Sequence, residues 1–178
     1  MSNQFNVTLL SNESINKYAK NVLSSFTNYI ECPLNLYGSW EVGISEIFYN
    51  DFTPSFNAFE KRKEMLEEGF IDTSVLEEID LKNQAVLKQN FSDMIYIHVD
   101  IISPRIVGDQ MVRCLKVMPA SGKQQEYVKF GRIEYYPVEL FHIRTISVLI
   151  LDSESNRIDF NQSFLPTMIT LHFRKIHI

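Results

Sequence analysis

Residues 95–101 read Ile-Tyr-Ile-His-Val-Asp-Ile, and apolar and polar residues alternate through this stretch without a break. Successive side chains of a β-strand point to opposite faces, so the pattern predicts a strand with one apolar and one polar face. Such a strand is typical of an antiparallel sheet that packs on a core with one side and meets water with the other. This stretch therefore favours an all-β fold.

The same alternation recurs on both sides of this stretch. It is found in residues 5–9, 26–34, 40–49, 112–118, 127–136, 146–150 and 169–173. Pro33 places its segment at an edge or a bend, since proline cannot donate to a ladder. In residues 40–49 the alternation slips at Glu46, which predicts a bulge or a strand end near Ser45. The segment 127–136 is interrupted by Gly131. About eight antiparallel strands joined mostly by short turns indicate a sandwich or a barrel.

Residues of about 55–91 follow a different pattern. Phe56, Phe59 and Leu66 recur at helical spacing with charges between them, and Ser74 precedes Glu77 at the spacing of a capping box. We expect one or two helices inserted between strands. With 178 residues, the chain has the length of one domain, so we expect a single domain over 1–178 with a helical insertion at about 55–91.

The charge and the apolar runs narrow the classes of function. The net charge is −5, whereas a general nucleic-acid binder presents a basic face to phosphate, so we expect no specific nucleic-acid binding. No apolar run reaches the roughly 18 residues of a membrane span. No secretory signal follows Met1, so Cys32 and Cys114 are expected to be free thiols in a protein that is not secreted.

One enzymatic alternative rests on two histidines and an aspartate. His98 and Asp100 are two positions apart in a strand, so their side chains share a face. With His172 they would supply the two imidazoles and one carboxylate that bind Fe(II) in non-haem oxygenases, and Arg174 would bind an acidic co-substrate. All four lie on polar strand faces, so the other interpretation is that they simply meet water.

Residues 103–115 form the least generic stretch. Pro104 is predicted to end the preceding strand, and Gly108 with Asp109 supplies a turn in which a positive φ is tolerated. Arg105, Asp109 and Arg113 would pair among themselves or across a subunit interface. The two interpretations, a loop that fixes its own geometry and an interface, stay open at this point.

Several blocks of the sequence resemble the minor capsid, or penton, proteins of Polinton (Maverick) elements and of related adintovirus-like elements. The blocks are residues 5–12, 24–29, 36–47, 96–119, 133–138 and 170–175. Residues 104–109, Pro-Arg-Ile-Val-Gly-Asp, are the most specific part. The resemblance rests on the order and spacing of the blocks, and it covers nearly the whole chain except about 55–90.

The resemblance implies a single jelly roll of two four-stranded antiparallel sheets, with no catalytic residues and no cofactor. It also implies a structural role: homopentamers at the vertices of an icosahedral shell, beside a double-jelly-roll major capsid protein. The protein would then be a virion component assembled inside the host cell, in the cytoplasm or the nucleus. The alternatives are the Fe(II)-dependent oxygenase on a double-stranded β-helix core and a generic β-sandwich module that binds a peptide or glycan.

Overall fold

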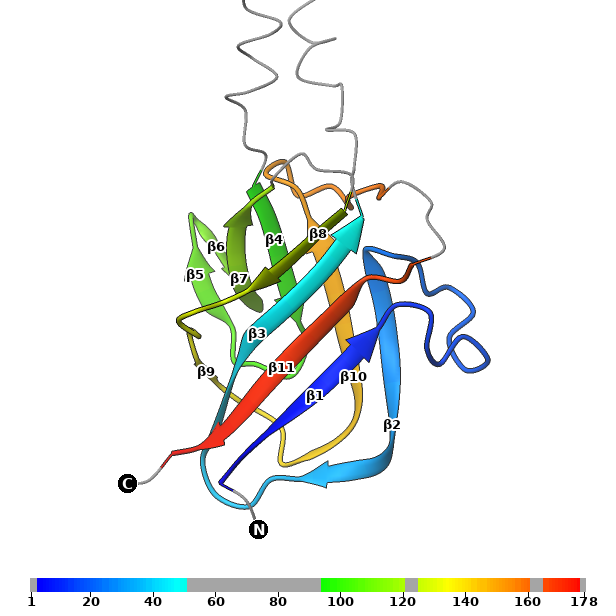
Figure 1. The fold of residues 1–178 in the computed structure, drawn as a ribbon. Coiled ribbons are helices and arrows are strands. Elements are labelled where there is room, and N and C mark those ends of the chain that lie inside the picture. Colours follow the sequence, from blue (N-terminus) through cyan, green and yellow to red (C-terminus); the bar gives the residue numbers. More distant parts are fainter. Residues whose placement is uncertain (1–2, 51–93, 121–124, 161–164, 177–178) are drawn as a thin grey trace, which may run out of the picture.

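The protein, described here by a computed structural model, is built from antiparallel β-strands (Figure 1). The structure describes residues 3–50, 94–120, 125–160 and 165–176. The strands are β1 (Gln4–Leu10), β2 (Ser25–Asn35), β3 (Trp40–Asn50), β4 (Met94–Val99), β5 (Arg105–Val107), β6 (Gln110–Val112), β7 (Cys114–Pro119), β8 (Gln125–Lys129), β9 (Tyr136–Pro137), β10 (His142–Leu151) and β11 (Met168–Lys175). No helix occurs within these ranges. The predicted helical insertion at about 55–91 lies outside the described residues.

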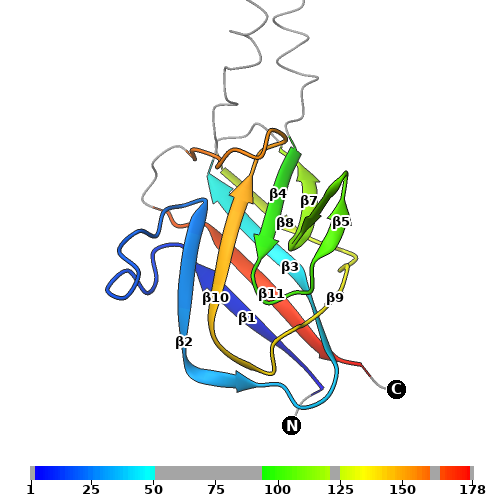
Figure 2. The same cartoon turned by 180° about the vertical axis from the view of Figure 1, so that it is seen from behind.

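Two sheets pack face to face, as Figures 1 and 2 show from opposite sides. The first has the order β1-β11-β3-β8, with the short β9 also paired to β3, and the second has the order β2-β10-β4-β7. The pairs β1–β11, β2–β10, β3–β8 and β4–β7 are nested in the sequence. This wrapping defines a single jelly roll, which confirms the predicted fold class. The strands β5 and β6 form a separate hairpin.

The core lies between the sheets and contains the residues that the alternation predicted. Ile95, Ile97, Val99 and Ile101 are at most 1% exposed. The strand itself is shorter than expected, because β4 ends at Val99 and Asp100 begins a turn. The prediction that Pro104 ends this strand is therefore wrong. The Asp100 carboxylate accepts a hydrogen bond from the Ser147 backbone N–H at 2.9 Å, which holds the chain where it leaves the sheet.

The predicted bulge in β3 is confirmed at Ser45. Thr170 of β11 pairs with Glu46 and the next residue, Leu171, pairs with Ile44, so Ser45 is skipped in the register. The extra residue shifts the phase of the strand by one. As a result Val42 and Ile44 before it, and Ile47 and Tyr49 after it, all face the core and are at most 3% exposed.

Pro33 has the effect that its chemistry predicts. Its strand β2 lies at the edge of the second sheet. The register with β10 jumps from Tyr29, opposite Thr145, to Leu34, opposite Ile143. The proline therefore sits in a bulged part of an edge strand, where no donor is needed.

The interruption at Gly131 produces a segment that crosses the outer face of the first sheet. β8 ends at Lys129 and β9 begins at Tyr136. Between them the chain passes over Gly43 of β3, which is buried although it faces away from the core. The Tyr135 hydroxyl lies 2.8 Å from Nδ1 of His172 on β11. We call residues 130–135 the crossing segment.

Candidate functional site

The stretch singled out in the sequence folds into the β5–β6 hairpin, which projects beside β7 (Figures 1 and 2). Ile106 pairs with Met111 and Val107 pairs with Gln110 around a two-residue turn. Gly108 in that turn has a φ of +64°, which glycine adopts without strain. The predicted turn is therefore confirmed.

Arg105 fixes one strand of the hairpin to the body of the domain. Its Nε donates to the Cys114 carbonyl at 2.6 Å, and an Nη donates to the Tyr136 hydroxyl at 2.7 Å. The guanidinium also lies over the Tyr136 ring, 4.3 Å from the centroid. A two-stranded hairpin alone is marginally stable in water, whereas hydrogen bonds from a charged group contribute about 1.5–3 kcal/mol each. Arg105 therefore supplies much of the anchoring.

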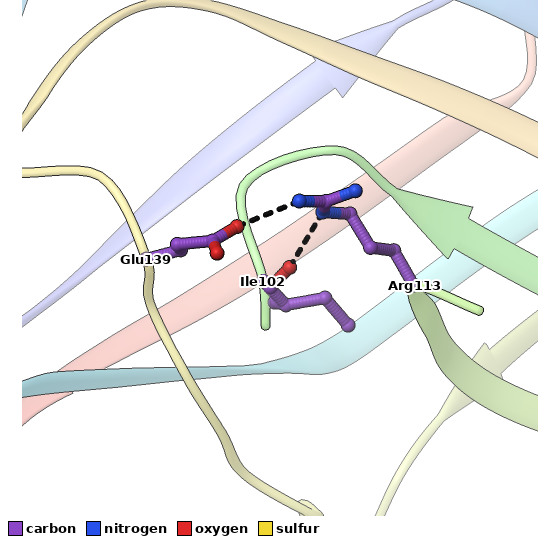
Figure 3. Close-up of polar contacts among 3 residues, drawn as sticks. All are labelled: Ile102, Arg113 and Glu139. Atoms are coloured by element: carbon purple, nitrogen blue, oxygen red, sulfur yellow. Dashed lines mark hydrogen bonds and ion pairs between the residues drawn. The ribbon is translucent and has the colours of Figure 1, made fainter. Parts of the chain in front are cut away.

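Arg113, which directly follows β6, fixes the second strand of the hairpin (Figure 3). Its Nε donates to the Ile102 carbonyl at 3.0 Å, and an Nη forms an ion pair with Glu139 at 2.7 Å. The side chains of this ion pair are each 44% exposed, so the pair adds at most about 1 kcal/mol. The bond to the carbonyl matters more, because it joins the hairpin base to the segment that bridges Ile102 and Val138.

The five residues predicted for a structural loop or an interface thus divide into two groups. Arg105 and Arg113 fix the hairpin base, and neither bonds to Asp109. Pro104, Gly108 and Asp109 are exposed, the first before β5 and the other two at the tip.

Sequence reasoning missed the apolar surface of this hairpin. Ile106 is 71% exposed and Met111 is 66% exposed. As directly opposed cross-strand residues they project from the same face and form one apolar pair. The signal was present in the sequence, since the two residues are placed symmetrically about Gly108 and Asp109.

The structure does not bring the three candidate iron ligands together. His98 lies on β4 of the second sheet and His172 on β11 of the first. Each histidine lies between two buried residues of its strand, so both point away from the core, on opposite outer faces. Among the described residues no three His, Cys, Asp or Glu side chains form a group that could hold a metal ion. The Fe(II) hypothesis is wrong for His98, Asp100 and His172.

Each histidine has a local structural environment instead. His98 and Asp100 line an open depression of about 880 Å³ over β2, β10 and β4. Burial lowers the pKa of His98, and the nearby Arg105 guanidinium lowers it further. Partial burial and Arg174 likewise lower the pKa of His172. The lowered pKa favours the neutral form of both imidazoles, which suits a hydrogen bond such as that between His172 and Tyr135.

The architecture places the chain in the class of single jelly rolls. No protein-family model matches the sequence, and no curated protein matches it. Among solved structures, the fold is similar to the crystal structure of the selenomethionine-labelled mavirus penton protein, with a TM-score of 0.51 and 11% sequence identity. The match covers 98% of this chain and 99% of that chain. The two proteins therefore share a penton-like jelly-roll fold over nearly their whole lengths. Within the part of the chain that the structure describes, there is no helix long and apolar enough to cross a membrane.

Proposed function

We propose that the chain is a penton-type capsid protein that forms homopentamers at the five-fold vertices of an icosahedral shell. The observation that carries the proposal is the match to the mavirus penton fold over 98% of this chain. A non-enzymatic role agrees with the separation of His98 from His172 on the two sheets.

The two flanks of the sandwich support a ring. The strands β1 and β2 form the edges on one side, and β8 and β7 form the edges on the other. A ring of identical subunits needs heterologous contacts, in which one flank meets the different flank of the next copy. The hairpin, whose base is fixed by Arg105 and Arg113, lies on the β7 side only.

The finer assignment rests on the sequence blocks. Their order supports a penton of the Polinton (Maverick) or adintovirus-like kind. Such a protein would sit in the virion beside a double-jelly-roll major capsid protein, after assembly inside the host cell. We propose one domain over 1–178 with the helical insertion at about 55–91. Within it, Arg105 and Arg113 would hold the hairpin, while Pro104, Gly108 and Asp109 would lie at a subunit interface.

The mass of the purified protein in solution tests the proposal. The chain weighs 20.8 kDa, so five copies would weigh about 104 kDa. Light scattering coupled to size exclusion, over a range of concentrations, should give this value. A mass that stays at that of one chain throughout would contradict the proposal and favour a monomeric binding module.

A further inference from the structure

We infer that the tip of the β5–β6 hairpin binds the loop at residues 11–24 of the next copy of this chain. This inference rests on the proposed pentamer and names the surfaces that would form it. One exposed apolar pair on the hairpin and two exposed apolar side chains in the loop, on opposite flanks of the sandwich, carry the inference together with their position along the sheet.

The hairpin contributes a rigid apolar tip. Ile106 and Met111 are 71% and 66% exposed, and their strands are hydrogen-bonded to each other. The hairpin base is held by Arg105 and Arg113 through bonds to backbone carbonyls. A fixed surface loses little conformational entropy on binding, so the tip is preorganised for a partner. Exposing this pair gives no stability to the isolated fold.

The loop at residues 11–24 is the complementary surface. Ile15 and Val22 are each 48% exposed. Asn21 fixes the loop, since its amide group donates to the carbonyls of Glu13 at 3.1 Å and Thr27 at 3.0 Å and accepts from the Thr27 N–H at 2.9 Å. With about half of each side chain exposed, both residues are accessible to a neighbouring copy.

The two surfaces lie on opposite edges of the second sheet, at the same level along its strands. Cys114 pairs with His98, His98 with Leu149, and Leu149 with Ser25. This row crosses the second sheet from the start of β7, next to the hairpin, to the start of β2, next to the loop (Figure 2). A head-to-tail contact between surfaces at equal height requires no shift along the strands. It therefore favours a closed ring over an open helix.

The two surfaces also offer one pair of exposed, opposite charges. Asp109 at the hairpin tip and Lys20 in the loop are both exposed. No ion pair joins either side chain to another of the described residues. An exposed pair adds little affinity but helps to select the partner and the register. The apolar contact would supply most of the affinity, as buried centres of interfaces do.

The first test compares the solution mass of four full-length proteins. The wild type is expected to have the mass of five chains. In the double variant Ile106→Asp with Met111→Asp, the constant for dissociation of the ring into single chains should rise at least about tenfold. Asp109→Lys should weaken the ring about two- to fivefold, and adding Lys20→Asp should restore it. Thermal melting of single chains should stay unchanged, because all four side chains are exposed.

A control variant and a cross-linking experiment locate the contact. Tyr37→Asp removes an apolar side chain that is 72% exposed, in the connection between β2 and β3, and should leave the ring intact. With Cys32→Ser as background, Met111→Cys and Val22→Cys together should give a ladder ending at five chains with a short bismaleimide. Either cysteine alone should give no ladder.

The outcomes separate the inference from the proposed function. A wild-type pentamer that survives the double variant and gives no ladder would overturn this contact and leave the penton assignment standing. A wild type that remains a single chain at every concentration would overturn both. Loss of the ring in Tyr37→Asp but not in the hairpin variants would place the interface elsewhere.

Discussion

Replacing Gly43 by alanine tests whether the crossing segment packs as tightly on β3 as the structure shows. A Cβ at Gly43 would lie 2.2 Å from the carbonyl oxygen of Glu134 and 2.5 Å from Cγ2 of Ile133. The first neighbour is backbone, so it cannot escape by changing a rotamer. The crossing segment would have to move outward and loosen the contact between Tyr135 and His172.

The cost follows from two opposing effects. Overpacking of this kind typically costs about 1–3 kcal/mol. Alanine in a strand recovers about 0.5–1 kcal/mol because glycine loses more chain entropy on folding. The expected net loss for Gly43→Ala is therefore about 0.5–2 kcal/mol. For a chain of this length the melting temperature would fall by about 1–8 °C.

Calorimetry and urea unfolding measure this loss, and Gly131→Ala is the matched control. Gly131 lies in the same crossing segment, but nothing approaches its Cβ position within 4 Å. The control should melt about 1–4 °C above the wild type, because it gains the entropy effect without the clash. If Gly43→Ala were as stable as the wild type, the close passage over β3 would be refuted.

Three other expectations concern Arg105, His172 and the two cysteines. Arg105→Met should lower the free energy of unfolding in urea by about 2 kcal/mol, and Glu139→Gln by less than about 1 kcal/mol; equal losses would contradict the anchoring assigned to Arg105. Because the pKa of His172 is lowered in the folded protein, the unfolded chain binds that proton first. The free energy of unfolding should therefore fall as the pH drops below the ordinary histidine pKa of 6.5. The fall should be smaller in His172→Asn, and melting curves across that pH range would show the difference. The exposed Cys32 thiol should react with a disulfide reagent in the native protein. The buried Cys114, whose pKa is raised by burial, should react only on unfolding. Rapid labelling of both thiols in the native wild type would contradict the burial of Cys114.

The sequence predicted the features that depend on local alternation. The apolar face of residues 95–101 and the bulge at Ser45 follow from the side-chain period of a strand, and the break at Gly131 follows from the glycine itself. Pro33 at an edge follows from its missing donor. The jelly-roll topology itself came from the resemblance of ordered blocks, because alternation does not say which strands pair.

The candidate site was predicted only in part, because its geometry depends on distant contacts. Arg105 and Arg113 were singled out, but their partners Tyr136 and Glu139 lie more than 20 residues away in the sequence. The iron hypothesis failed for the same reason. Periodicity placed His98 and His172 on polar strand faces, but it could not show that those faces belong to different sheets.

The bulge at Ser45 also governs which deletions and insertions this strand tolerates. Removing Ser45 would leave a regular strand in which Val42, Ile44, Ile47 and Tyr49 still alternate on the core face. A single deletion elsewhere in β3 would instead turn the apolar residues on one side of it outward, and an insertion of one residue on the same strand would restore the phase. Length changes of one residue should therefore be accepted at the bulge and, elsewhere in β3, only in compensating pairs.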